Sequence, residues 1–255
     1  FRREVGNQWH LIFQMEICVD SLESAENAIE GGATRLEICS ALSEGGLTPT
    51  PGFIRKVKSL ATIPIYAMLR ARSGNFVYRK EEMEIMLEDL EILKDCGVNG
   101  FVFGALTSSN EIDVESCKKI LFAARPLPVT FHRAFDEVKD PSTSLEILID
   151  LGFERILTSG QKDTAEEGLE LIKELIQQAR NRIIVMPGSG IAGKNILKIK
   201  LASNAKEFHA SAKKKVATSD NMNRVKIGAS KETCKIVTDR KLVQEMVDII
   251  KSTAE

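Results

Sequence analysis

The sequence has few aromatic residues and no excess of charge of either sign. Of its 255 residues, only 5% are Phe, Trp or Tyr, and 35 basic side chains stand against 36 acidic ones, for a net charge of −1. Nucleic-acid surfaces rely on clustered positive charge, and single-strand binding adds aromatic side chains that stack on bases. The composition therefore argues against a nucleic-acid partner.

Long apolar runs and ordered cysteine patterns are also missing. No apolar run approaches the roughly 18 residues of a membrane-spanning helix, so we expect no membrane partner. The five cysteines are widely scattered and form neither a Cys-x-x-Cys pair nor a common zinc-ligand spacing. Such a set is typical of free thiols in a reducing compartment, and cytoplasm is the expected location. Residues 1–13 lack the apolar core of a signal peptide and are interpreted as a short N-terminal extension.

What the sequence does contain is a regular alternation of short apolar runs with helical segments, and 43% hydrophobic residues to form a core. The predicted strands are residues 15–20, 36–40, 63–69, 100–103, 128–132, 155–158, 182–186 and 206–209. The predicted helices are residues 21–30, 51–60, 80–95, 114–124, 141–151, 165–179, 194–201 and 242–251. Eight strand–helix pairs predict a single-domain α/β fold over residues 14–255, the TIM (β/α)8 barrel. A doubly wound open sheet is the alternative.

One segment, residues 211–240, interrupts this regularity. It has no clear period and contains three consecutive lysines, Lys213, Lys214 and Lys215. Because it follows the eighth predicted strand, we expect it at the carboxyl end of the barrel. Long loops in compact domains are usually functional or disordered. Two interpretations stay open, a mobile surface excursion and a lid over the mouth of the barrel.

Alternation along the predicted strands directs a polar set of side chains into the barrel. Successive residues of a strand face opposite ways, and in a barrel the apolar face packs on the helices. The side chains expected inside are Glu16, Cys18, Glu37, Cys39, Tyr66, Met68, Arg70, Arg72, Thr130, His132, Glu207 and His209. A purely structural interior would hold bulky aliphatic residues. The set therefore favours a functional site, although a salt-bridge network would produce the same pattern.

Part of this set suits acid/base chemistry on a small anion. The candidate catalytic residues are Glu16, Glu37, Arg70, His132, Glu207 and His209. A turn of small residues after the seventh predicted strand is placed where barrels often bind phosphate, although a plain strand-to-helix connection explains it equally well. The candidate anion-binding residues are Arg72, Ser159, Gly188, Ser189 and Gly190. No organic cofactor is indicated.

Cys18 and Cys39 occupy equivalent positions in two neighbouring strands, each two residues after a glutamate. Buried cysteines commonly pack as small apolar residues, which is the first interpretation. A redox pair is the second, and no local motif supports it. A soft-metal site is the third, because two thiolates suit Cu(I). Two ligands are few for a metal site, so the local pattern leaves all three open.

Six motifs carry the most distinctive part of the sequence. They are residues 15–21, 35–49, 101–107, 126–136, 152–160 and 186–191. In order and in detail they resemble the CutC family of copper homeostasis proteins, most closely its animal members. The resemblance extends over roughly residues 14–250 and implies a TIM barrel that forms homo-oligomers, either dimers or tetramers.

The resemblance also implies Cu(I) binding at two cysteines, and the matching residues here are Cys18 and Cys39. It further implies a cytoplasmic and also nuclear location. Ser189 departs from the family's Pro-Gly-Gly-Gly turn, and Ala210 stands where some relatives carry a cysteine. The first hypothesis is thus a Cu(I)-binding protein of copper homeostasis. The second is an uncharacterised barrel enzyme, lyase-like or isomerase-like, acting on a phosphorylated or carboxylated metabolite.

Overall fold

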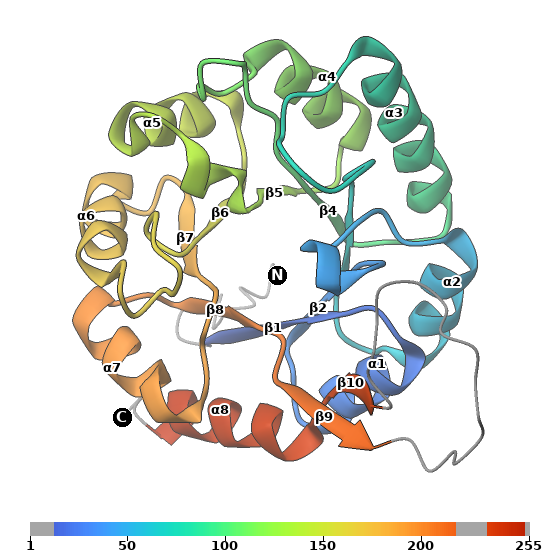
Figure 1. Cartoon of the computed structure of the whole chain (residues 1–255), viewed down its shortest axis with the longest axis vertical. Helices are drawn as coiled ribbons and strands as arrows, with labels where there is room; N and C mark the ends of the chain where they lie inside the picture. The colour runs from blue at the N-terminus through green and yellow to red at the C-terminus, as the bar shows by residue number, and fades with distance from the viewer. Residues whose placement is uncertain (1–12, 218–233, 253–255) are drawn as a thin grey trace, which may run out of the picture.

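Eight parallel strands form the barrel of this protein, surrounded by helices (Figure 1). The computed structural model describes residues 13–217 and 234–252. The strands are β1 (Gln14–Val19), β2 (Arg35–Ile38), β3 (Ile65–Met68), β4 (Gly100–Phe103), β5 (Val129–Phe131), β6 (Arg155–Thr158), β7 (Ile184–Pro187) and β8 (Glu207–Ala210). They pair in the order β7-β6-β5-β4-β3-β2-β1-β8, and β7 lies beside β8 to close the ring. The predicted TIM barrel is confirmed.

The helices follow the strands in alternation. They are α1 (Leu22–Glu30), α2 (Pro51–Leu60), α3 (Lys80–Asp95), α4 (Val114–Ala124), α5 (Pro141–Leu151), α6 (Leu169–Ala179), α7 (Gly193–Ser203) and α8 (Arg240–Ser252). Two short 3-10 helices, η1 (Leu42–Glu44) and η2 (Arg133–Glu137), lie in the loops after β2 and β5. Within the described ranges, we find no helix that combines the length and apolar character needed to cross a membrane.

Local sequence signals explain where several helices begin. The side chains of Ser21, Thr50 and Asp140 accept hydrogen bonds from the backbone N–H three residues later, at the N-termini of α1, α2 and α5. Such caps satisfy backbone donors that have no partner within the helix. The helix predicted from residue 165 instead begins at Leu169. Reciprocal hydrogen bonds between Thr164 and Glu167 hold a separate turn ahead of it.

The hydrophobic core lies between the sheet and the surrounding helices. Its largest fully buried side chains include Phe101, Phe103, Phe131 and Phe208, on strands β4, β5 and β8. Burying a side chain of this size contributes about 1.5–3 kcal/mol relative to leaving it exposed. Because these apolar residues face the helices, the residues between them along each strand face the inside of the barrel.

The segment after β8 contains more order than its sequence indicates. Strands β9 (Lys213–Ala217) and β10 (Cys234–Thr238) pair antiparallel, outside the barrel and next to α1 (Figure 1). Asn27 of α1 donates to the carbonyl of Thr238, at 2.9 Å. The long loop expected over residues 211–240 therefore contains two strands that were not predicted, because exposed lysines conceal the strand pattern. Residues 218–233, on which a lid would depend, lie outside the described residues.

Candidate metal and active site at the barrel mouth

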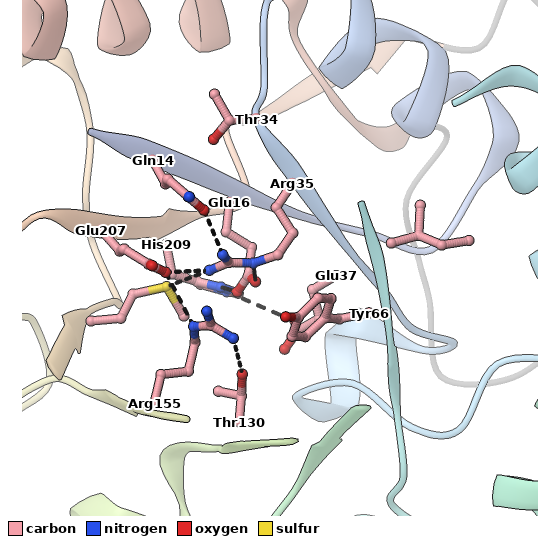
Figure 2. Close-up of polar contacts among 12 residues, drawn as sticks. Gln14, Glu16, Thr34, Arg35, Glu37, Tyr66, Thr130, Arg155, Glu207 and His209 are labelled. Carbon is pink, nitrogen blue, oxygen red and sulfur yellow. Dashed lines mark hydrogen bonds and ion pairs between the residues drawn. The ribbon is translucent and has the colours of Figure 1, made fainter. Parts of the chain in front are cut away.

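A buried charge network occupies the interior below the mouth of the barrel (Figure 2). Arg35 donates to Glu16 at 2.5 Å and to Glu207 at 2.6 Å. Arg155 donates to Glu207 at 3.1 Å and to Glu154 at 2.6 Å. Buried charges are tolerated when they are paired in this way. We call Glu16, Arg35, Arg155 and Glu207 the charged floor.

The two arginines of the floor, Arg35 and Arg155, are not among the side chains predicted to face the interior. Arg35 is two residues before Glu37 and therefore shares its inward face, but the predicted strand began one residue too late to include it. Arg155 begins a strand that was predicted correctly, and strict alternation with Leu157 could have identified it. The arginines that were predicted inside, Arg70 and Arg72, instead contact backbone carbonyls and Glu82.

Glu16 links the charged floor to the mouth through His209. The register of β1 and β8 places the two residues side by side, and His209 Nδ1 lies 2.8 Å from Glu16 Oε1. Burial favours the neutral acid, but Arg35 and His209 hold the pKa of Glu16 well below its usual range. Because an ionised carboxylate only accepts hydrogen bonds, Nδ1 of His209 carries the proton.

The other ring nitrogen of His209 faces a cysteine and a second glutamate. Candidate ligand atoms of Cys18, Glu37 and His209 all lie within 4.8 Å of one another, and all three residues are buried. The β1–β2 register places Cys18 directly opposite Glu37. Burial alone would lower the pKa of His209, but the charges of Cys18 and Glu37 raise it well above its ordinary value. We call these three residues the Cys–Glu–His group.

Cys39 lies close to this group but has different surroundings. Its thiol donates to Glu37 Oε2 at 3.4 Å, and it packs in a small apolar cluster with Tyr66 and Met68. Burial, followed by the charge of Glu37, raises the pKa of the Cys39 thiol well above its ordinary value. Among the residues of the described chain, Cys39 belongs neither to the Cys–Glu–His group nor to the lining of the cavity above it.

That cavity has a volume of about 750 Å³, and Cys18, Glu37 and His209 contribute to its wall. Arg70 and His132 line it as well. The predicted interior residues thus separate into two levels. Glu16 and Glu207 belong to the charged floor, whereas Glu37, His132 and His209 reach the cavity.

His132 lines the cavity and carries a buried hydrogen-bond donor. Its Nδ1 accepts from the backbone N–H of Ala134 at 3.2 Å, so the proton of the neutral ring is on Nε2. Nε2 is buried and has no partner within residues 13–217 and 234–252. Burial and the nearby charge of Arg70 lower the pKa of His132 to about 3. Gly104 allows the ring to pack this closely, because a Cβ there would lie 2.5 Å from Nδ1.

Arg70 brings a positive charge to the same wall without a carboxylate partner in the described chain. Its terminal nitrogens donate to the backbone carbonyls of Glu44, Gly46 and Gly74. These bonds tie together the loops after β2 and β3. Its Nε is buried and has no partner in the part of the chain that the structure describes.

The predicted anion-binding residues do not converge. Ser189 and Gly190 line the cavity, next to the N-terminus of α7. Ser159 is bound to Asp136, and Arg72 forms an ion pair with Glu82 at 2.6 Å. Gly188 packs tightly, because a Cβ there would lie 2.5 Å from Leu157 Cδ1.

Comparison with known proteins agrees with the motifs and the fold. The model of the CutC family matches residues 13–214. The chain belongs to the CutC family. The human copper homeostasis protein cutC homolog is 54% identical over 201 residues, which cover 79% of this chain and 74% of that protein. The Caenorhabditis elegans homolog is 48% identical over 200 residues, which cover 78% of this chain and 80% of that protein.

Solved structures of CutC and of other barrels share the fold. A crystal structure of a copper homeostasis protein CutC from Streptococcus agalactiae superposes with a TM-score of 0.75 and 34% identity, covering 78% of this chain and 99% of that one. Phosphoribosylanthranilate isomerase from Thermotoga maritima superposes with a TM-score of 0.58 at 14% identity, covering 94% of this chain and 100% of that one. At that identity, the second likeness shows the fold alone.

Proposed function

We propose that this CutC-family protein takes part in copper homeostasis by binding Cu(I) at the mouth of its barrel, through the thiolates of Cys18 and Cys39. The names of the relatives point to copper, and the two cysteines of this chain provide soft sulfur ligands for it. The observation that carries the proposal is the position of Cys18, which is 7% exposed and lies in the wall of the cavity. An ion entering from the mouth therefore meets a sulfur ligand.

Cys39 supplies the second thiolate on this proposal. Its proton must leave when the metal binds, and Glu37 Oε2, which already accepts the S–H at 3.4 Å, is in place to receive it. Two thiolates with one Cu(I) carry less net charge than two free thiolates, which reduces the cost of ionising buried sulfur. Soft sulfur ligands favour Cu(I) over Mg²⁺ and Ca²⁺.

Competition with a Cu(I) chelator, under anaerobic reducing conditions, tests this proposal. We expect one tight Cu(I) per wild-type chain and weaker binding in both Cys18→Ala and Cys39→Ala. Cys117→Ala is the matched control, because Cys117 is also buried but lies in α4. Wild-type Cu(I) affinity in the double Cys18→Ala, Cys39→Ala variant would overturn the proposal.

An enzymatic role is the second candidate, and the buried donors of the cavity favour it. His132 Nε2 and Arg70 Nε are both buried in the wall of a cavity of about 750 Å³, without partners among the described residues. This volume is that of a small-molecule site. The two donors could stabilise negative charge that develops on a carboxylated or phosphorylated metabolite, while Glu37 transfers a proton.

Thermal-shift measurements with phosphorylated and carboxylated metabolites test the enzymatic role. A true ligand should raise the melting temperature of the wild type and have little effect on His132→Gln. Lys139→Gln serves as a control variant, because Lys139 is exposed and away from the cavity lining. A shift that persists in His132→Gln would place the ligand elsewhere.

We also propose a homo-oligomer in the cytoplasm and nucleus, as the family resemblance implies. Light scattering coupled to size-exclusion chromatography measures the first property. Fluorescence imaging of the tagged chain measures the second.

A further inference from the structure

We propose that Cys18, Glu37 and His209 form a second kind of metal site, for a divalent ion of the zinc type, with Glu16 as the residue that orients His209. This inference goes beyond Cu(I) binding, because it assigns an imidazole and a carboxylate as ligands and does not require Cys39. Cys18 is the only ligand that the two proposals share, so Cys39 and His209 distinguish the failure of one from the failure of the other.

The Cys–Glu–His group already has nearly the spacing that such an ion requires. Its ligand atoms lie within 4.8 Å of one another. Zinc binds sulfur at about 2.3 Å and nitrogen or oxygen at about 2.0–2.2 Å, which puts tetrahedral ligands roughly 3.3–3.8 Å apart. A contraction of about 1 Å, within reach of side-chain rotation, would complete the site. Zinc accepts all three ligand types, whereas a hard carboxylate is a poor ligand for Cu(I).

Glu37 carries a buried oxygen that is available to a cation. Glu37 is 3% exposed, and its Oε1 has no hydrogen-bond partner among the described residues. Leaving a buried polar atom unpaired costs about 1–3 kcal/mol, and more when the group is charged. The other oxygen of Glu37 accepts from Cys39 and lies 3.9 Å from His209 Nε2. A cation bound between Cys18 and His209 would give Oε1 its partner.

The charged floor holds His209 in a ligand orientation. Glu16 Oε1 lies 2.8 Å from Nδ1, and Glu16 Oε2 is held by Arg35. Metal-binding histidines generally donate their second ring N–H to a carboxylate or carbonyl, which fixes the ring. Because Glu16 holds Nδ1 of His209, the other ring nitrogen, Nε2, faces Cys18 and Glu37. Glu16 is therefore a positioning residue and Arg35 its anchor, and neither touches the ion.

The site would remain open on one side. Three protein ligands leave a fourth position free in catalytic zinc sites. Here the three ligands lie in the wall of the cavity of about 750 Å³. The free position therefore faces a space large enough for a small molecule. Such a geometry is more typical of a catalytic metal site than of a metal-storage site.

Parallel titrations of one set of folded variants test this inference. Zn²⁺ affinity is measured against a chromophoric chelator and Cu(I) affinity as described above, on wild type, His209→Ala, Glu37→Gln and Cys39→Ser. We expect His209→Ala and Glu37→Gln to lose about tenfold or more in Zn²⁺ affinity. Cys39→Ser should keep its Zn²⁺ affinity and lose Cu(I) affinity, whereas His209→Ala should keep its Cu(I) affinity.

Spectroscopy and controls make the outcome decisive. Co²⁺ in place of Zn²⁺ should give a thiolate charge-transfer band that is absent in Cys18→Ala. Cys117→Ala is the control, because Cys117 is buried in α4 and lies outside the cavity lining, and circular dichroism verifies the folding of each variant. Glu16→Gln should weaken Zn²⁺ by about 10–100-fold without removing the Co²⁺–thiolate band, as expected for a residue that acts through His209.

Two results would overturn the inference. One is wild-type Zn²⁺ affinity in folded His209→Ala. The other is loss of Zn²⁺ affinity in folded Cys39→Ser, which would place both metals on the cysteines. If the double Cys18→Ala, Cys39→Ala variant keeps its Cu(I) affinity but Zn²⁺ binds as expected, the Cu(I) proposal fails and the Cys–Glu–His site is supported.

Discussion

The charged floor and the mouth of the barrel contain similar residue types in opposite electrostatic states. In the floor, Glu16 and Glu207 each contact an arginine at hydrogen-bond distance. At the mouth, Glu37, Arg70 and His132 each keep a buried atom without a partner in the described chain. Buried polar groups are normally satisfied. The floor is therefore a self-contained structural network, whereas the mouth is the part of the interior to which the proposals above assign a ligand.

The largest expected effect comes from breaking the floor. Arg35→Ala removes the arginine partner of Glu16 and leaves Glu207 with Arg155 alone, and we expect the free energy of unfolding to fall by about 3–5 kcal/mol. Urea denaturation followed by circular dichroism measures this fall. A loss below about 1 kcal/mol would show that the network is not structural.

Binding of Zn²⁺ at the mouth of the barrel should stabilise the folded protein. At a free Zn²⁺ concentration of 100 times the dissociation constant, we expect a gain of about 2.7 kcal/mol in the free energy of unfolding. The same denaturation experiment measures it, with His209→Ala as the comparison. An equal gain in that variant would place the zinc elsewhere on the chain.

His132 should make stability depend on pH. Its pKa is about 3 in the folded protein, below the ordinary value of 6.5, because of burial and Arg70. Between these values, the unfolded chain holds a proton that the native chain does not, so stability present above pH 6.5 is lost as the pH falls. From pH 7 to pH 5, wild type should lose about 2 kcal/mol more than His132→Gln. Parallel pH dependences in the two proteins would contradict the buried neutral imidazole.

The smallest effect is expected at Glu37. Burial raises the pKa of Glu37, although His209 opposes this. Because the acid gains little from its surroundings, Glu37→Gln should change the free energy of unfolding by less than about 1 kcal/mol in metal-free protein. This is the direct contrast with Arg35→Ala, measured in the same way. A loss as large as that of the floor variant would remove the distinction between the two levels.

Much of the fold could be predicted because its signals are local. Helix α3 was predicted over residues 80–95 and α5 over residues 141–151, as they occur in the structure. Caps and apolar spacing within each segment explain this success. The β9–β10 ribbon could not be predicted, because exposed strands such as Lys213–Ala217 have no buried face to impose alternation.

The candidate site could be predicted only in outline. Alternation correctly placed Cys18, Glu37, His132 and His209 in one interior, and all four line the cavity. It did not distinguish them from Glu16 and Glu207, which follow the same pattern but lie in the floor. The strand-start error that omitted Arg35 also omitted the cation that pairs with both of these acids.

By itself, the sequence determined the alternating strands and helices, and with them which side chains face the inside of the barrel. It also determined membership of the CutC family through long motifs. Only the tertiary structure decided which buried charges neutralise one another and which buried polar atoms have no partner in the described chain. The reason is that strand alternation is a property of each segment, whereas pairing depends on register between segments. The β1–β2 and β1–β8 registers bring Cys18 to Glu37 and Glu16 to His209.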